Sequence, residues 1–143
     1  MRNFLRVLFA IVLGLVVGSV VNMALITASG KVIAPPVGAD VATMEGLKAS
    51  MHLFEPKHFL FPFLAHALGA LAGAFVAALL APNRSLVPPM VVGALFLAGG
   101  IANVIMLPSP MWFTLVDLLL AYLPTAWLGR TLAARVQARR TGA

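Results

Sequence analysis

Residues 59–81 read FLFPFLAHALGALAGAFVAALLA, an apolar stretch whose one ionisable side chain is that of His66. At about 1.5 Å of rise per residue, a helix over this stretch is long enough to cross a hydrocarbon layer of about 30 Å. Small residues recur along it at every fourth position: Ala65, Gly69, Gly73 and Ala77. The stretch therefore predicts a membrane-spanning helix with one face suited to close helix packing.

Three further apolar stretches have a similar length, and they place the other expected spans at 4–28, 86–107 and 111–128. The chain of 143 residues is 62% hydrophobic and 10% charged, whereas soluble domains are near half apolar and a quarter charged. The first stretch exceeds the apolar core of about 7 to 15 residues found in signal peptides, so we expect a retained helix. The prediction is an all-α protein: a four-transmembrane-helix bundle in one domain, built as two antiparallel hairpins.

Residues 29–58 form the one long connection and are expected to lie on the outer side of the membrane. Apolar residues recur there at spacings of 3, 4 and 3: Met44, Leu47, Met51 and Phe54. This pattern predicts a short amphipathic helix that ends before Pro56. The helix would lie on the membrane surface or across the mouths of the spans, where a cap over the helix ends is the simplest role.

Basic residues predict the orientation of the spans. Arginines lie near the N-terminus, in the second connection and after the last span: Arg2, Arg6, Arg84, Arg130, Arg135, Arg139 and Arg140. This bias predicts cytoplasmic N- and C-termini. The net charge of +6 then reflects membrane topology, and no nucleic-acid partner is expected.

Two stripes of small residues predict how the first two spans pack. Gly14 and Gly18 lie four residues apart in the first span, as Gly69 and Gly73 do in the second. Small residues at this spacing let helix backbones approach closely. The simplest interpretation is a tight hairpin of these spans, and the alternative is a contact between copies in a homo-oligomer.

Four polar residues lie within the expected spans: Asn22, His66, Asn103 and Asp117. Counting from the outer helix ends places all four about 7 to 11 Å below the outer interface, in one layer. Polar side chains at such a depth usually face the bundle interior and find partners, and His66 with Asp117 is the expected pair. The layer could form a proton-coupled or small-ligand site, or a structural clamp in which Asn22 and Asn103 bond across helices.

A second polar group, His52, Glu55 and His58, lies in the long connection. These are ligand types for zinc or another divalent ion, but steps of three residues do not place them on one helix face. Interfacial side chains at the start of the second span are the simpler interpretation. No cofactor is required by the sequence; a metal- or haem-dependent enzyme using His52, His58 and His66 is the weakest hypothesis.

The absence of cysteine excludes disulfides and thiolate sites. The sequence has no phosphate-binding glycine loop and no nucleophile elbow. Without a complete catalytic constellation, we expect a non-enzymatic accessory or interaction protein that works with the bilayer, with copies of itself or with a larger membrane protein. The alternative is a proton-coupled or small-ligand transport or binding protein that uses the polar layer.

The stretch Met51-His52-Leu53-Phe54-Glu55-Pro56-Lys57-His58-Phe59 continues through Pro62 and Ala65-His66-Ala67-Leu68-Gly69 to Ala81. With the Leu107-Pro108 turn and Trp112-Phe113, it resembles a group of small, uncharacterised bacterial inner-membrane proteins with four predicted spans. The resemblance covers most of the chain and implies a bacterial inner-membrane location. It carries no functional residue over to this sequence.

Overall fold

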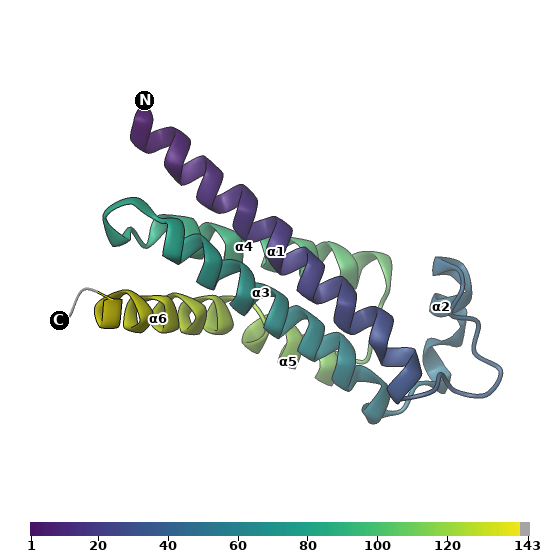
Figure 1. Cartoon of the computed structure of the whole chain (residues 1–143). Coiled ribbons are helices and arrows are strands. Elements are labelled where there is room, and N and C mark those ends of the chain that lie inside the picture. Colours follow the sequence, from purple (N-terminus) through teal and green to yellow (C-terminus); the bar gives the residue numbers. More distant parts are fainter. Residues whose placement is uncertain (141–143) are drawn as a thin grey trace.

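The computed structural model describes residues 1–140, and this part of the chain is all-α (Figure 1). Four of its helical segments are long and apolar enough to cross a membrane: Arg2–Val32, Pro56–Leu80, Val87–Met106 and Met111–Arg140. They correspond to the four predicted spans. The all-α prediction is therefore confirmed over the described residues, and the number of candidate spans is as expected.

The elements follow one another along the chain with short connections. The four α-helices that carry most of the candidate spans are α1 (Arg2–Val32), α3 (Leu60–Leu80), α4 (Val87–Met106) and α6 (Leu123–Arg140). Shorter helical elements complete the structure: α2 (Met44–Ser50), η1 (Met51–Leu53), η2 (Pro56–Phe59), η3 (Pro82–Arg84) and α5 (Met111–Leu120).

The central element is α3, which packs against α1, α6 and α4, most extensively against α1. Its alanines form the middle of the core, since Ala65, Ala70, Ala74 and Ala77 are all fully buried. Helix α6 packs more extensively against α3 than against α4. The two expected hairpins are thus joined through α3, which contacts all the other long helices.

The crossing of α1 and α3 depends on glycines on both helices. A Cβ atom added to Gly14 would lie 2.7 Å from the carbonyl oxygen of Gly73, and one added to Gly18 would lie 2.6 Å from that of Gly69. Such distances are shorter than van der Waals contact, so only glycine permits this backbone approach. The structure thus places the two predicted glycine stripes against each other within one chain.

The fourth candidate span is broken in the middle, between α5 and α6. Pro124 has no backbone N–H and its ring would clash with the carbonyl of the residue four positions earlier, which is Leu120, the last residue of α5. The hydroxyl of Thr125 compensates by donating to the carbonyls of Ala121 at 2.6 Å and Tyr122 at 3.0 Å. The structure thus resolves the fourth predicted span into two helices.

Helix α6 continues to Arg140, well beyond the predicted end of the span at residue 128. Its small residues Gly129 and Ala133 are buried, and a Cβ atom on Gly129 would lie 2.4 Å from the carbonyl oxygen of Leu71. The side-chain amide of Gln137 also donates to the carbonyls of Ala78 and Leu79, at 3.4 and 3.3 Å. Packing against α3 therefore extends the helix past the apolar stretch on which the prediction was based.

The long connection contains the predicted short helix, but α2 ends at Ser50. Thr43 caps it by accepting from the amide of Gly46 at 2.9 Å, and the hydroxyl of Ser50 accepts from the amide of Asp40 at 2.9 Å. Phe54 lies outside α2 in an extended conformation. Figure 1 shows α2 beyond the end of the long helices, and its contacts are mainly with η1.

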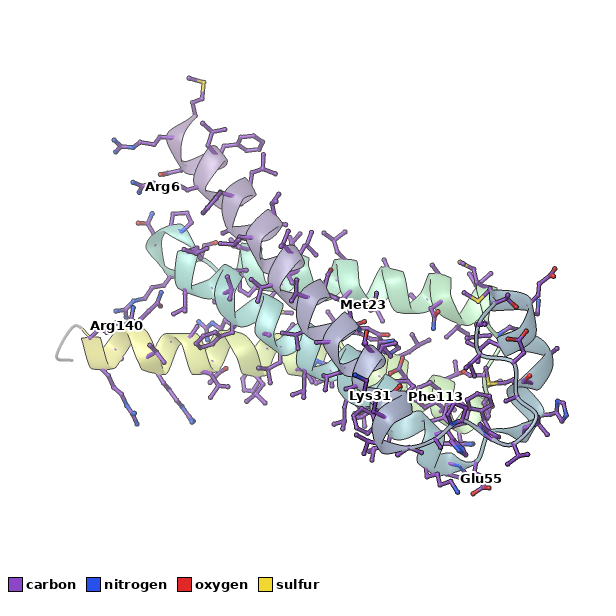
Figure 2. All side chains as sticks on the ribbon, turned by 45° about the vertical axis from the view of Figure 1, so that its right-hand side comes forward. Arg6, Met23, Lys31, Glu55, Phe113 and Arg140 are labelled. Atoms are coloured by element: carbon purple, nitrogen blue, oxygen red, sulfur yellow. The ribbon has the colours of Figure 1, made fainter. Side chains whose placement is uncertain are left out.

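The two ends of the bundle differ in charge (Figure 2). Arg6 and Arg140 lie at one end, which we call the terminal end because the described part of the chain begins and ends there. The turn between α3 and α4, which contains Arg84, lies at the same end (Figure 1). Lys31 and Glu55 lie at the opposite end, which we call the loop end.

Replacing Gly14 with alanine should weaken the α1–α3 crossing, because the new methyl group must displace the backbone of Gly73. We expect the free energy of unfolding to fall by about 1–3 kcal/mol, as for other overpacked sites. Gly30→Ala is the matched control, since a Cβ atom there meets nothing within 4 Å. Equal stability of the two variants in an unfolding titration would contradict the proposed role of the glycine crossing.

Replacing Thr125 with valine keeps the shape of the side chain but removes the hydroxyl that donates to the helix break. The carbonyl of Ala121 then loses its donor, whereas that of Tyr122 keeps the amide of Ala126 at 2.9 Å. We expect the free energy of unfolding to fall by about 1–2 kcal/mol. Thr131→Val is the control, because the hydroxyl of Thr131 bonds the carbonyl of Trp127 at 2.9 Å inside the continuous helix α6. There the carbonyl keeps its backbone partner, so the control should be nearly as stable as the parent protein.

Candidate functional site

The buried carboxylate of Asp117 on α5 pairs with the ring of His66 on α3. The Nδ1 atom of His66 lies 2.9 Å from each carboxylate oxygen. The side chain of Asp117 is 3% exposed and that of His66 is 17% exposed. The pair predicted from the sequence is therefore formed, and it joins two elements that are far apart along the chain.

Tyr122, at the junction of α5 and α6, completes this group. Its hydroxyl donates a hydrogen bond to Oδ2 of Asp117 at 3.0 Å. Its ring stacks on that of His66, with centroids 5.6 Å apart and an angle of 27° between the planes. Gly100 on α4 makes room for it, because a Cβ atom there would overlap the Tyr122 ring. The carboxylate thus has two donors within a closely packed aromatic contact.

This geometry fixes the tautomer of His66. A carboxylate is an acceptor only, so the hydrogen bond from His66 to Asp117 requires a proton on Nδ1. The second ring nitrogen, Nε2, makes no hydrogen bond to residues 1–140. In the neutral ring, Nε2 is therefore an acceptor that is free to bond another molecule.

The exposed edge of His66 lies on the wall of a hollow of about 430 Å³ between α1, α3 and α4. We call it the polar hollow. It is lined by Leu15, Ser19, Asn22, Met23, His66, Leu95, Phe96, Gly99, Gly100, Asn103 and Tyr122. Three of the four residues predicted to form a polar layer line this one space, and the fourth, Asp117, lies directly behind His66.

The side-chain amides of Asn22 and Asn103 make no hydrogen bond to any described part of the chain. The structural clamp considered for the polar layer requires these two side chains to bond across helices. That bond is absent between α1 and α4 in the described structure, whereas the bond between His66 and Asp117 is present. The polar layer is thus a bonded pair on one side and a set of unpartnered amides on the other.

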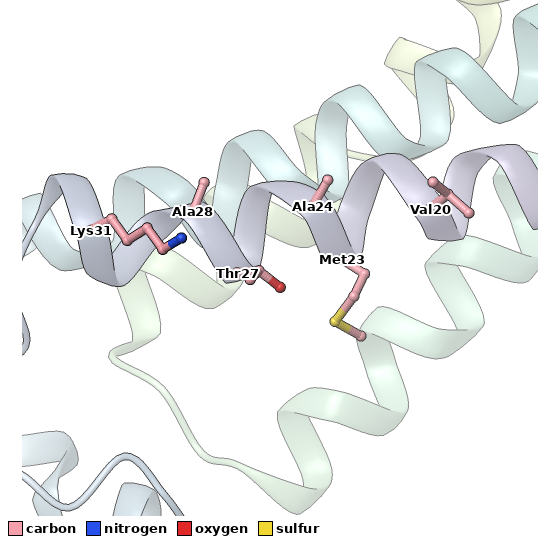
Figure 3. A pocket seen from close by; sticks show the side chains of 6 residues that line it. All are labelled: Val20, Met23, Ala24, Thr27, Ala28 and Lys31. Atoms are coloured by element: carbon pink, nitrogen blue, oxygen red, sulfur yellow. The ribbon is translucent and has the colours of Figure 1, made fainter.

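A second hollow of about 460 Å³ runs along one side of α1 towards the loop end (Figure 3). We call it the α1 groove; it is lined by Val20, Met23, Ala24, Thr27, Ala28 and Lys31. Figure 3 shows Met23 pointing from α1 towards α4. Met23 lines both hollows, so the two lie next to each other at this residue.

The group proposed as a weak metal site does not assemble in the described residues. Within residues 1–140, no three histidine or acidic side chains form a cluster that could hold a metal ion. The Nδ1 atom of His52 bonds the carbonyl of Ala49 at 2.9 Å, and that of His58 accepts from the amide of Glu55 at 2.9 Å. Each of these two histidine rings is thus hydrogen-bonded to a nearby backbone group.

Glu55 itself pairs with Lys57, whose Nζ lies 3.0 Å from Oε2. The hydrogen bond and charge of Lys57 lower the pKa of the Glu55 carboxyl from its usual value. Both side chains are well exposed, so water and salt screen the pair. The pair is therefore a weak, local contact between residues two positions apart.

Comparison of the chain with protein-family models, curated proteins and solved structures finds no match. The class that the fold defines is an all-α protein with four candidate membrane spans. The geometry of the polar hollow alone therefore carries the functional interpretation.

The sequence did not indicate Tyr122 as part of the site. In an unbroken helix, residues five positions apart point about 140° away from each other, so Tyr122 should have faced away from Asp117. The break between α5 and α6 brings the two side chains together. The available signals were Pro124 and the fact that Tyr122 is the only tyrosine of the chain.

Replacing His66 with phenylalanine should leave the carboxylate of Asp117 buried without its cationic or N–H partner. We expect the free energy of unfolding to fall by about 3–5 kcal/mol. The double variant with Asp117→Asn should recover part of that loss, because a neutral amide can still accept from Tyr122 and carries no charge. Both would be measured by chemical unfolding. Equal stability of the single and double variants would contradict a buried charge at Asp117.

Proposed function

We propose that this chain is a four-span protein of the bacterial inner membrane that binds a small amphiphilic molecule in the polar hollow. The observation that carries the proposal is the set of hydrogen-bonding groups on α1, α3 and α4 that face this hollow without protein partners. The proposed protein thus has the predicted four-span topology, and its predicted polar layer serves as a ligand-binding site.

The distribution of charge supports a membrane orientation. The terminal end contains both ends of the described part of the chain and the turn with Arg84, so it gathers the arginines of the N-terminus, the turn and the end of α6 (Figures 1 and 2). An excess of basic residues marks the cytoplasmic side of a membrane protein. The loop end, with the polar hollow nearer to it, then faces the periplasm.

The unpartnered amides support a ligand in the hollow. A polar group in hydrocarbon is destabilising when it lacks hydrogen bonds. For an amide the free-energy cost is about 2–7 kcal/mol. Asn22 and Asn103 belong to the layer about 7 to 11 Å below the expected interface. Their amides therefore need water or a bound molecule. The hollow of about 430 Å³ is within the range of small-ligand sites, which is about 300–1,000 Å³.

The pair of His66 and Asp117 gives the site a defined chemistry. Asp117 holds Nδ1 of His66 and fixes the direction of the ring, as carboxylates that accept from the ring N–H do for functional histidines. Nε2 is then the group of the pair that can accept a hydrogen bond or a proton from a molecule in the hollow. This arrangement supports binding and proton-coupled transport more directly than catalysis, because the hollow has no nucleophile paired with the histidine.

An accessory role in a larger assembly stays a prediction, and one observation favours it. Of the residues of α1, only Ala10, Gly14 and Gly18 are buried, so this helix presents most of its apolar surface outward. That surface suits lipid, a second copy of the chain or a larger membrane protein. Ligand binding and assembly through α1 are compatible, because the polar hollow involves only one side of α1.

Filling the polar hollow tests the proposed function. Gly99 lines the hollow and a Cβ atom there meets nothing within 4 Å, so Gly99→Phe adds a ring without a backbone clash. Gly30→Phe is the matched control, since Gly30 has equally open space and does not line the hollow. Both variants would be purified from bacterial membranes in mild detergent, and their bound small molecules identified by native mass spectrometry.

The parent protein and Gly30→Phe should each retain a bound amphiphile at near-equal occupancy, and Gly99→Phe should lose it at least ten-fold. Equal retention by all three proteins would show that the molecule binds elsewhere. Absence of any bound molecule from the parent protein, after reconstitution with a total membrane lipid extract, would also overturn the proposal.

A further inference from the structure

The geometry points to a ligand whose head group is neutral and carries a hydroxyl proton, such as a phenol-headed lipid, with an apolar tail that follows the α1 groove. This inference rests on the proposed function, since it names the chemistry of the molecule in the polar hollow. Its support comes from the charges, the hydrogen-bonding groups and the groove that lies next to the hollow along α1.

The charges around the hollow disfavour an anionic head group. None of the residues that line the polar hollow is lysine or arginine. The ring of His66 could become cationic, but the carboxylate of Asp117 lies 2.9 Å from its Nδ1 and would balance that charge. An anion would therefore lose its hydration without gaining a net positive partner.

A cationic head group is disfavoured for a related reason. The one carboxylate near the hollow already accepts hydrogen bonds from His66 and from Tyr122. Asp117 is 2% exposed and does not line the hollow. An ammonium group would thus meet no carboxylate oxygen directly, and a neutral head group is the better match.

The hydrogen-bonding groups select a protic head group. Because Nδ1 of His66 bonds Asp117, Nε2 of the neutral ring needs a donor, which a hydroxyl group supplies. The amides of Asn22 and Asn103 can both donate to and accept from the same head group. The ring of Phe96 also lines the hollow, and it provides a flat apolar wall for an aromatic head.

The α1 groove provides a path for the tail. It lies next to the polar hollow at Met23 and continues to Lys31, a length of about 12 Å along the helix. Apart from Thr27 and Lys31, its lining residues are apolar. A single alkyl or isoprenoid chain would contact this apolar surface between the polar hollow and Lys31.

Four ligands with the same ring and tail separate the possible head groups. The probes are 4-decylphenol, its methyl ether 4-decylanisole, the anionic 4-decylbenzoate and the cationic 4-decylbenzylamine. Each would be titrated at neutral pH into the protein in phosphatidylcholine nanodiscs, with histidine side chains labelled with nitrogen-15. The readout is the Nε2 resonance of His66, which is assigned with the variants His52→Gln and His58→Gln.

We expect 4-decylphenol to shift the Nε2 resonance of His66 and to bind at least ten-fold more tightly than the other three probes. A ten-fold difference corresponds to about 1.4 kcal/mol, as expected for loss of one hydrogen bond to a desolvated acceptor. Asn22→Leu should weaken 4-decylphenol more than 4-decylanisole. Tightest binding of the benzoate or the benzylamine, or equal binding of phenol and ether, would overturn the inference about the head group.

The variant Gly99→Phe separates this inference from the proposed function. Suppose that a charged probe or the ether binds the parent protein most tightly. If Gly99→Phe abolishes binding of that probe, the hollow is a ligand site and only the head-group assignment fails. If all four probes bind equally to Gly99→Phe, Gly30→Phe and the parent protein, the hollow is not the binding site and both proposals fail.

Discussion

The buried carboxylate of Asp117 imposes the main constraint on this structure. A carboxylate that is almost fully buried must be compensated by donors, and here these come from His66 on α3 and from Tyr122 at the junction of α5 and α6. These two hydrogen bonds to the Asp117 carboxylate fix α5 against α3 and turn the junction of α5 and α6 inward. They also hold the His66 ring at the wall of the polar hollow. The direction of the free Nε2 atom is a consequence of that same bond.

The hollow itself follows from unequal helix packing. Glycine pairs hold α1 tightly on α3, whereas α1 and α4 make fewer contacts with each other. Space is therefore left between α1 and α4 on the side towards which Met23 points (Figure 3). The close approach of α1 to α3 and the open space between α1 and α4 therefore have the same cause, which is the position of α1 on α3. A small bundle can thus hold a cavity without a large domain around it.

Much of this arrangement could be predicted from residue spacing. The four apolar stretches, the glycine stripes at Gly14, Gly18, Gly69 and Gly73, and the pair of His66 and Asp117 follow from helical periodicity and from the cost of isolated polar groups. The end of α6 could not be predicted from hydropathy, because contacts of Gly129 and Gln137 with α3 extend that helix. The hydrogen bond between Tyr122 and Asp117 could not be predicted either, because the 3.6-residue helical period assumes an unbroken helix.

The sequence by itself determined that the chain has four apolar helical stretches long enough to cross a membrane and that a small set of polar residues lies at a similar depth within them. Those properties depend on local composition and on the 3.6-residue period. Only the tertiary structure decided that Asn22 and Asn103 remain unpaired around a hollow while His66 and Asp117 bond. The reason is physical: which polar groups meet depends on how closely each pair of helices approaches and on the break before Pro124, and both result from contacts between distant parts of the chain.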